Sequence, residues 1–593
     1  MPELTIDVIN NKLCMKFPYR PDILEAIKTV PSRKWDKDVR GHYIGKYDLP
    51  GVIDIFQSFN YEVKYSPAAM FVMKYFIEWR HRMIALKKGE VTGAYNVDLK
   101  KPLRPFQKIG HDYLVYAQSG IVADDMGLGK TVQVLSTYKT LKEQGKARRM
   151  LVLCPSTVKG AWIKDIAKFT DLTYINIDGD YGERKEQYLV NSDIIIMSYD
   201  SYLMDFGISE RRKKAEEKGS REPIPLPLGI DVCAFDECQR LVRLKNKTTQ
   251  SLLILKEKLH LNYIYPMTGT PIVNRVEDLW SLMVFIDPEV LGEFWQFRSR
   301  YCEIEYEEIK MLDPKKRKMG IFEKVVRKIP HVVGYKNLDE LKTKIDPYYI
   351  RREKKEVLKD LPDKTYETFE LELTPDQRDM YNELKDQFFN EFKDVDVNMA
   401  NALVWFIRAK QICDTAEILH PGMKDSAKMN ESKDILTDLI ENDNHKVVIF
   451  SQYKEMTDIL VRDFSKYNPL YLHGDVKTAD RQFLIDAFQE DPKYKLFIST
   501  LRAGGVGITL TAADIVILYD KWFSPAANNQ AIDRVHRIGQ ENPVTVIDFI
   551  CRDTIEERIE TILERKKTMF AGIFGEDEAL LGKLSSEELR SLL

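Results

Sequence analysis

A nine-residue segment, Ala123–Thr131 (A-D-D-M-G-L-G-K-T), places the tightest constraint on how this chain can fold. It follows the apolar pair Ile121-Val122 and precedes a segment, 132–141, with the pattern of a helix. A glycine-rich turn between a strand and a helix points backbone N–H groups at one spot, where the helix dipole also favours an anion. Lys130 would then reach the β- and γ-phosphates of a nucleotide, and the Thr131 hydroxyl would hold Mg²⁺.

The match to the phosphate-loop pattern G-x-x-x-x-G-K-S/T is imperfect, because Asp124 occupies the position of the first glycine. A glycine-rich helix start with an exposed lysine is therefore an alternative for the segment taken alone. A carboxylate pair, Asp236-Glu237, directly follows the apolar run 231–235 and favours the nucleotide interpretation. A phosphate-loop protein needs one carboxylate to fix magnesium and a second group to orient the attacking water, and this pair matches those roles.

Two arginines supply a third component of the expected nucleotide site, after the phosphate loop and the carboxylate pair. Arg534 and Arg537 lie three residues apart in the segment Gln530–Gln540, a spacing that predicts one shared face of a helix. Two guanidinium groups on one face can stabilise the negative charge that develops on a transferred γ-phosphoryl group. A surface helix carrying ion pairs is the alternative.

Composition limits the class of protein. The 593 residues are too many for one core and indicate three or four domains. No stretch approaches the ~20 apolar residues that a membrane span needs. The seven cysteines form no C-x-x-C pair, and the first ten residues lack the pattern of a signal peptide. We therefore expect a cytoplasmic protein with no membrane partner, zinc site or disulfide framework. The net charge of −3 requires any nucleic-acid surface to be local.

Apolar runs define the expected architecture. They are continuous rather than alternating, which is typical of strands buried on both faces of a parallel sheet. The runs are 150–154, 194–199, 232–235 and 263–267, and then 446–450, 496–499, 515–519 and 544–550. Helical patterns separate them, so we expect an α/β fold with two tandem parallel-sheet domains.

The first ~65 residues differ from the rest. Within 30–47, basic residues alternate with aromatic ones: Arg33, Lys34, Trp35, Lys37, Arg40, Tyr43, Lys46 and Tyr47. Such a surface can follow phosphates and stack bases. A small β-hairpin whose aromatics pack on a helix at 22–29 is equally compatible. The segment 68–86 predicts an amphipathic helix that packs against the next domain.

Several further segments interrupt or flank the sheets. Segments 287–347 and 376–418 are helical in pattern, and the first contains a basic run, 314–318, that is either a solvated face or a DNA-facing protrusion. Segment 205–229 is charged, then proline-rich, and predicts a surface loop. Residues 585–588 form a capping box that would open a last short helix.

Taken together, the motifs resemble those of the Swi/Snf-type ATPases of helicase superfamily two, over about Leu103 to Lys567. The matching segments are Leu103–Gln107, Asp125–Thr131, Trp162–Phe169, Met267–Pro271, Ile350–Pro362, Ile449–Gln452, His473-Gly474, Ser499–Leu510 and the arginine segment. The family also places acidic residues at Asp124 and Asp125. The first residues resemble the HepA-related (HARP) module found beside the motor in annealing helicases.

This resemblance implies two RecA-like lobes with helical insertions, preceded by a small α+β module. The expected divisions are a module at 1–66, a connecting helix at 67–100, lobes at 101–360 and 361–570, and a tail at 571–593. The expected helical inserts are about 287–347 and 374–425.

The resemblance also implies ATP and Mg²⁺ as cofactors, with a role for each matching residue. Gln107 would read the adenine, and Asp125, Gly127, Gly129, Lys130, Thr131 and Gln530 would bind nucleotide. Thr131 and Asp236 would hold the metal. Glu237 would position water, and Lys130, Arg534 and Arg537 would complete the catalytic set. Ser198, Tyr199, Thr268, Gly269, Ser451, His473, Gly474 and Thr500 would contact the phosphates of one DNA strand.

The implied activity is movement along double-stranded DNA by a monomer, and the module adds remodelling or reannealing of forked DNA in replication, recombination or repair. A strand-separating helicase with a wedge at 314–318 and a nucleotide-gated DNA-binding scaffold are alternatives. Two departures from the family pattern occur. Gln239 replaces histidine in D-E-A/G-H, and Phe523-Ser524 replaces W-N in D-x-x-W-N-P. Neither changes the hydrolytic residues.

Overall fold

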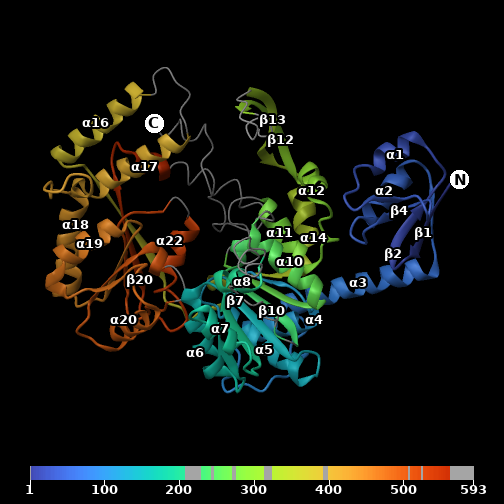
Figure 1. The fold of residues 1–593 in the computed structure, drawn as a ribbon, viewed down its shortest axis with the longest axis horizontal. Helices are drawn as coiled ribbons and strands as arrows, with labels where there is room; N and C mark the ends of the chain where they lie inside the picture. Colours follow the sequence, from blue (N-terminus) through green and yellow to red (C-terminus); the bar gives the residue numbers. More distant parts are fainter. Residues whose placement is uncertain are drawn as a thin grey trace.

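The computed structural model describes residues 2–207, 227, 229–241, 246–269, 276–312, 324–391, 399–504, 508–522 and 525–560. A first lobe, a second lobe and an N-terminal module lie side by side, with the module joined to the first lobe by one long helix (Figure 1). In this part of the chain, we find no helix with the length and apolarity that a membrane crossing requires.

The first lobe is built on a seven-stranded sheet in which every pairing is parallel. Its order is β14 (Tyr349–Ile350), β6 (Ile121–Val122), β11 (Tyr263–Met267), β10 (Ile230–Asp236), β7 (Arg149–Cys154), β9 (Ile194–Ser198) and β8 (Tyr174–Asn176). Its helices are α4 (Pro105–Ala117), α5 (Lys130–Glu143), α6 (Lys159–Phe169), α7 (Tyr181–Gln187), α8 (Tyr199–Asp205), α10 (Lys247–Leu259) and α11 (Val276–Ile286). The four strands predicted in this region are confirmed.

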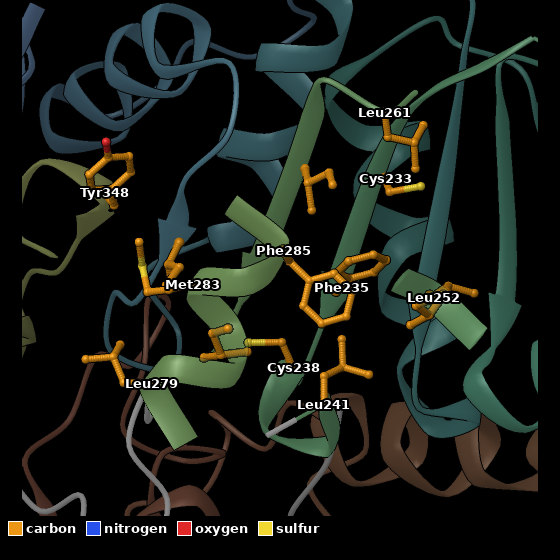
Figure 2. Close-up of a cluster of buried hydrophobic side chains, with 14 of the residues drawn as sticks. Cys233, Phe235, Cys238, Leu241, Leu252, Leu261, Leu279, Met283, Phe285 and Tyr348 are labelled. Atoms are coloured by element: carbon orange, nitrogen blue, oxygen red, sulfur yellow. The ribbon is translucent and has the colours of Figure 1, made fainter. Parts of the chain in front are cut away.

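The continuous apolarity of these strands has a direct structural reason. Successive residues of β10 enter different hydrophobic clusters on the two faces of the sheet. Cys233 and Phe235 pack with α11, where the Phe235 and Phe285 rings lie 5.4 Å apart (Figure 2). Val232 and Ala234 belong to the cluster on the opposite face. A strand covered on both sides needs apolar residues at every position.

The second lobe repeats this design with six parallel strands. Their order is β15 (Lys364–Leu371), β20 (Val544–Cys551), β19 (Ile515–Leu518), β16 (Val447–Ser451), β18 (Leu496–Thr500) and β17 (Leu470–Leu472). The helices are α16 (Pro375–Glu391), α17 (Met399–Asp414), α18 (Ala427–Leu436), α19 (Lys454–Asp463), α20 (Thr478–Glu490), α21 (Leu501–Gly504) and α22 (Pro525–Ile532). The predicted fold class, α/β with two parallel-sheet lobes, is confirmed.

The N-terminal module is a mixed sheet with two helices, which confirms the expected small α+β unit. Its strands, in sheet order, are β3 (Lys34–Asp36), β4 (Gly41–Ile44), β2 (Lys12–Lys16), β1 (Glu3–Ile9) and β5 (Glu62–Tyr65), with helices α1 (Pro21–Ile27) and α2 (Leu49–Ser58). The connecting helix is α3 (Pro67–Lys88). Tyr47 packs edge-on against Phe76 of α3 and against Tyr348 of the first lobe, and Lys344 pairs with Asp48 at 2.6 Å. The module is therefore fastened to the first lobe by packing and charge.

The segment 287–347 differs from its predicted helical pattern. Between α12 (Phe294–Tyr301) and α14 (Leu338–Ile345), two long antiparallel strands, β12 (Cys302–Leu312) and β13 (Lys324–Tyr335), form a hairpin that projects from the lobe (Figure 1). The helical prediction is wrong here because β13 is rich in valine and isoleucine, whose branched side chains favour a pleated strand. The basic run 314–318, the tail residues 585–588 and most of 205–229 lie outside the described residues.

Candidate nucleotide site between the lobes

The phosphate loop leads from β6 into α5, which begins at Lys130. Gly127 and Gly129 have φ angles of 84° and 75°, in the left-handed region that glycine adopts most readily. The Lys130 Nζ donates to the carbonyl oxygens of Asp124 and Asp125, at 2.8 and 3.3 Å. The ammonium group therefore lies over the loop, at the position expected for a phosphate-binding lysine.

A buried ion pair explains why aspartate replaces the first glycine. Asp124 is fully buried, and the Arg352 Nε donates to its Oδ1 at 2.9 Å while Arg352 Nη2 donates to Oδ2. Gln133 of α5 donates a further hydrogen bond to Oδ2 at 2.9 Å. Asp124 thus ties the phosphate loop to the residue that follows β14. Sequence inspection missed this role because the arginine lies 228 positions away.

We expect Arg352→Met to destabilise the first lobe by about 3–5 kcal/mol, because it leaves a buried carboxylate without its cation. Urea unfolding would measure the loss, and the double variant Arg352→Met/Asp124→Asn should recover part of it. Arg148→Met is the matched control, since Arg148 forms the same two-bond pair with Asp231 at the surface. The control should change stability by about 0–1 kcal/mol. Equal losses in both single variants would contradict this interpretation.

The two carboxylates follow β10 as predicted. Asp236 accepts hydrogen bonds from Trp162 Nε1 at 2.8 Å and from the Glu237 backbone N–H at 2.9 Å. Burial, reinforced by the charge of Glu237, raises the pKa of Asp236 to about 6. Glu237 has a φ of 51°, which costs a non-glycine residue on the order of 1–3 kcal/mol. Such backbone strain is typical of functional sites.

Gln239 links this carboxylate pair to the next strand. Its amide Nε2 donates to Glu237 Oε2 at 2.6 Å, and its Oε1 accepts from the Thr268 hydroxyl at 3.1 Å. The bridge between the nucleotide site and Thr268 therefore forms with glutamine in the position where the family pattern has histidine.

The arginine segment differs locally from the prediction. Helix α22 ends at Ile532, and Arg534 and Arg537 lie in the turns that follow, so the prediction of a shared helix face is wrong. The backbone N–H of Arg534 bonds three residues back and that of Arg537 only two, which breaks the α-helical ladder. Both arginines nevertheless line one cavity with Lys130 and Asp236.

This cavity, of about 220 Å³, lies between the two lobes. From the first lobe it is lined by Met126, Gly127, Gly129, Lys130, Thr131, Val158, Ala161, Lys164, Asp165, Asp236, Glu237 and Met267, and from the second by Gln482, Ile485, Ile508, Thr509, Arg534 and Arg537. Of the residues predicted to bind nucleotide, Gln107, Asp125 and Gln530 are not among those that line it. Gln107 is buried beneath the loop, where its Nε2 donates to the Leu128 carbonyl at 3.1 Å.

Contacts across the cavity are direct. Gln530 Nε2 donates to Glu237 Oε1 at 3.4 Å, and Arg537 lies so close to Gly127 that a Cβ there would be 2.8 Å from the arginine Cβ. Burial, with repulsion from Arg537, lowers the pKa of Arg534 to about 10. A guanidinium group keeps its proton at neutral pH, so both arginines are cations. The arrangement places two desolvated cations opposite a phosphate loop and two carboxylates, as a site for an anionic nucleotide requires.

Comparison with known proteins agrees with this geometry. Residues 71–418 match the family model described as the SNF2-related domain, and residues 428–539 match the helicase conserved C-terminal domain. The chain belongs to the SNF2-related family. The match begins within α3, so the N-terminal module lies outside it.

Several relatives of this SNF2-related chain carry helicase names. It is 30% identical over 522 residues to the putative ATP-dependent helicase/translocase YwqA of Bacillus subtilis, covering 83% of this chain and 51% of the relative. It is 28% identical to the ATP-dependent helicase fft1 of Schizosaccharomyces pombe, covering 83% and 55%. The chain thus spans about half the length of these curated relatives. The solved Sulfolobus solfataricus SWI2/SNF2 ATPase core in complex with dsDNA is 29% identical, covering 84% of this chain and 98% of that one, with a TM-score of 0.35.

The residues predicted to contact DNA lie at or directly after the carboxyl ends of parallel strands in the two lobes. Five of them are buried: Tyr199, described below, and the hydroxyl residues Ser198, Thr268, Ser451 and Thr500. The Ser198 and Thr500 hydroxyls accept from backbone N–H groups three residues on. The Thr268 and Ser451 hydroxyls donate to side chains far away in the sequence, Gln239 and Asp520. Gly269 and His473 are partly exposed and Gly474 is exposed. These three have the accessible backbone that a phosphate contact needs.

Tyr199 requires a correction. It is buried, and its hydroxyl donates to the Asp236 carbonyl oxygen at 2.8 Å. Its side chain therefore positions the carboxylate pair from beneath and is not available for DNA in this structure. The resemblance implied a DNA contact around Ser198-Tyr199, and a sequence motif does not reveal the direction of a side chain at a strand end.

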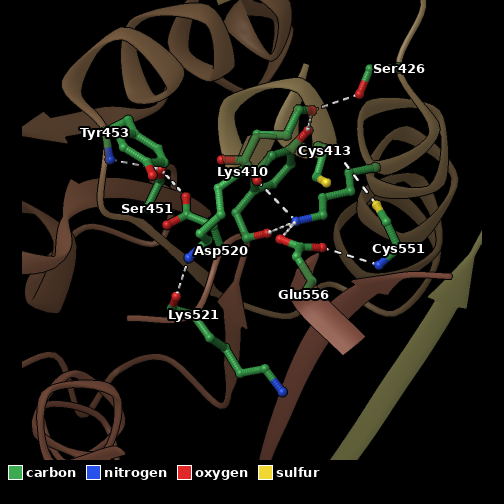
Figure 3. Close-up of polar contacts among 12 residues, drawn as sticks. Lys410, Cys413, Ser426, Ser451, Tyr453, Asp520, Lys521, Cys551 and Glu556 are labelled. Carbon is green, nitrogen blue, oxygen red and sulfur yellow. Dashed lines mark hydrogen bonds and ion pairs between the residues drawn. The ribbon is translucent and has the colours of Figure 1, made fainter. Parts of the chain in front are cut away.

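A buried polar network, which sequence inspection missed, fixes the strand ends of the second lobe (Figure 3). The Ser451 hydroxyl donates to the Asp520 carboxylate, which also accepts the Gln452 backbone N–H at 2.9 Å. Nearby, the buried Lys428 pairs with Asp414 at 2.9 Å and with Glu556 at 2.7 Å. These bonds join the α17–α18 insert to the ends of β16, β19 and β20. The network gives the edge that bears Ser451 a single rigid geometry.

Proposed function

We propose that the protein is an ATP-driven motor that moves along double-stranded DNA. The observation that carries this proposal is the cavity between the lobes, where Lys130, Asp236 and Glu237 of the first lobe face Arg534 and Arg537 of the second. A site assembled from two lobes couples hydrolysis to their relative motion. The name of the Bacillus subtilis relative, putative ATP-dependent helicase/translocase, supports the same activity.

ATP would bind with its phosphates on the N–H groups of the loop, and Lys130 would exchange the Asp124 and Asp125 carbonyls for phosphate oxygens. The donors for Mg²⁺ fit this ion, because the Thr131 hydroxyl and the Asp236 carboxylate are hard oxygen ligands. The raised pKa of Asp236 also supports a metal site at this residue. Burial and the charge of Glu237 disfavour the ionised form of Asp236, and a bound cation would stabilise that form. The resemblance assigns adenine recognition to Gln107, but its amide lies under Gly129 and donates to the Leu128 carbonyl, so in this structure it braces the phosphate loop.

In the proposed reaction, Glu237 orients the attacking water and accepts its proton. Gln530 and Gln239 each donate to one Glu237 oxygen and hold the carboxylate in place. Arg534 and Arg537 stabilise the negative charge that builds up on the γ-phosphoryl oxygens. All of these groups meet only when the lobes are together, which places hydrolysis in the closed state.

The DNA would lie across the carboxyl ends of the strands, against the accessible backbone of Gly269, His473 and Gly474. Contacts of this kind read phosphates and carry no base sequence information. The buried hydroxyls of Ser198, Thr268, Ser451 and Thr500 would hold those strand ends in shape. We therefore expect binding that depends on salt and tolerates any base sequence.

The N-terminal module is proposed to direct the motor to branched DNA, as its likeness to the HARP module implies. Trp35 is 53% exposed and lies 4.6 Å from the ring of His42, which stacks in turn on Phe17 at 5.6 Å. Burial, with repulsion from Arg33, lowers the pKa of His42 to about 4, so its ring is neutral at pH 7. A cavity of about 370 Å³ adjoins this stack and is also lined by Arg40. Aromatic rings beside arginines are typical of sites that stack unpaired bases.

Steady-state ATP hydrolysis with no DNA, single-stranded DNA, duplex and forked DNA, at one salt concentration, tests the proposed motor. We expect duplex to stimulate hydrolysis and a fork to stimulate it most. Stimulation by single strands as strong as by duplex would favour a strand-separating helicase instead. Tight ATP binding with no hydrolysis on any DNA would favour a nucleotide-gated scaffold.

We expect Trp35→Ala to weaken fork binding by about 5- to 150-fold, the range for losing one base–aromatic stack, and to leave duplex binding within twofold. Titration of a labelled fork and a labelled duplex of equal length would measure both affinities. Tyr366→Ala is the matched control, because Tyr366 is 54% exposed on β15 of the second lobe. A loss on duplex as large as on the fork would show that the module only braces the motor.

A further inference from the structure

Lys354 is a buried cation that joins the two lobes at the nucleotide site. It begins α15 (Lys354–Val357), the element that directly follows β14 in the first lobe. Its side chain reaches the second lobe, where Nζ lies 2.5 Å from Asp533 Oδ1 and donates to the His536 carbonyl oxygen at 2.7 Å. One ammonium group therefore bonds to both ends of the turn that carries the arginines.

The backbone around Lys354 is tied to the phosphate loop as well. The Lys354 N–H donates to Asp125 Oδ2 at 2.9 Å, and the Asp125 N–H donates back to the Arg352 carbonyl at 3.0 Å. Arg352 also forms the buried ion pair with Asp124. Arg352 and Lys354 thus hold the consecutive loop residues Asp124 and Asp125. Through its side chain, Lys354 also holds the turn at 533–537.

The burial of Lys354 makes this contact specific. Only 8% of the residue is exposed, and burial lowers its pKa while the Asp533 carboxylate opposes that effect. A buried charge is stable only with its partner, and the loss of one partner leaves the other uncompensated. The buried ion pair between Lys354 and Asp533 therefore fixes the position of the arginine turn relative to the phosphate loop. Apolar packing alone would allow the turn several positions.

We propose that Lys354 is a positioning residue for ATP hydrolysis, which holds the turn 533–537 so that both arginines face the phosphate loop. Arg534 follows the first anchor, Asp533, and Arg537 follows the second, His536. Lys354 and Arg537 both pack against Gly127. A Cβ added to this glycine would lie 3.6 Å from Lys354 Cε and 2.8 Å from Arg537 Cβ. A shift of the phosphate loop is transmitted through Lys354 to the arginines. This inference rests on the proposed function of the site.

Lys354→Met tests the proposal, because methionine keeps most of the alkyl stem and removes the charge. We expect kcat for ATP to fall by about 100-fold, the effect of misplacing catalytic groups by ~1 Å, while the affinity for a fluorescent ATP analogue changes less than threefold. Lys355→Met is the matched control, since the neighbouring Lys355 side chain is 70% exposed and pairs with Glu353 at 2.9 Å. The control should retain kcat and affinity within twofold.

Two further variants separate positioning from folding. Lys354→Met/Asp533→Asn should be no slower than the slower single variant, because both changes break the same contact. Lys354→Arg should recover part of the lost kcat, since a cavity of about 330 Å³ beside Lys354 and Asp533 has room for a longer cation. Multiplicative losses in the double variant, or a fall in ATP affinity that parallels kcat, would overturn the proposal.

Hydrogen exchange gives a readout that needs no hydrolysis. In Lys354→Met, amides 534–537 should exchange at least tenfold faster than in the parent, while the central strand β7 stays protected. Unchanged exchange in this turn would refute the positioning role, whatever the ATPase result. Absence of hydrolysis in the parent protein would refute the proposed motor and leave the exchange test intact. The two failures are thus distinguishable.

Discussion

Glu237→Gln is expected to reduce ATP hydrolysis by about 10³-fold or more and to leave ATP affinity within threefold. The amide keeps the size and hydrogen-bonding reach of the side chain, but it cannot accept a proton from water, and the other groups of the cavity remain in place. Steady-state and single-turnover hydrolysis, with titration of a fluorescent nucleotide, would measure the two effects separately.

The control for this change is Glu257→Gln, because Glu257 is exposed on α10 of the same lobe. It should hydrolyse ATP at the parent rate. Hydrolysis that survives in Glu237→Gln would contradict the assignment of Glu237 as the group that orients water. A parallel loss of affinity would instead indicate that the substitution disturbs the strained turn at this residue.

Replacing Arg537, the arginine that packs against Gly127 of the phosphate loop, is expected to have the second large effect. Arg537→Lys should lower kcat by about 10³-fold, within the 10³–10⁵ range attributed to arginines that stabilise a transferred phosphoryl group. Lysine keeps the charge but not the planar fork, whose Nη1 here donates to Thr509 Oγ1 at 3.0 Å. ATP affinity should change much less, because the charge that Arg537 stabilises develops during the reaction.

Arg462→Lys provides the matched control, since Arg462 lies on α19 of the second lobe and forms a two-bond pair with Glu417 at the surface. It should retain the parent kcat. If Arg537→Lys weakened ATP binding as much as turnover, the arginine would serve ground-state binding rather than the reaction. If it changed neither quantity, the arginine turn would have no role in hydrolysis.

Much of the fold follows from local sequence patterns. Continuous apolar runs of about five residues predicted eight strands, and each is present, because a residue covered on both faces of a sheet must be apolar whatever its neighbours are. The phosphate loop was predictable for a similar reason, since strand, glycine turn and helix are contiguous. The carboxylate pair Asp236-Glu237 also follows its strand directly, so its place at the carboxyl edge of the sheet required no tertiary information.

Predictions failed where a local sequence pattern was compatible with two different backbone conformations. The spacing of Arg534 and Arg537 suits a helix, but the chain leaves helix α22 at Ile532 and reaches the cavity through turns. The hairpin β12–β13 replaced a predicted helix, since two strands can satisfy each other's hydrogen bonds across a ladder that sequence periodicity does not reveal. Tyr199 turned inward to Asp236 because side-chain direction at a strand end depends on what packs beneath it.

The sequence by itself determined the family, the two-lobed α/β architecture and the groups that would handle a nucleotide, because each depends on contiguous residues. Only the tertiary structure decided how the groups meet. Asp124 pairs with Arg352, Gln530 reaches Glu237, and Lys354 holds the turn that bears the arginines, across separations of 228, 293 and 179 positions. Buried charges select their partners by distance and desolvation in the folded chain, and neither quantity is encoded in sequence spacing.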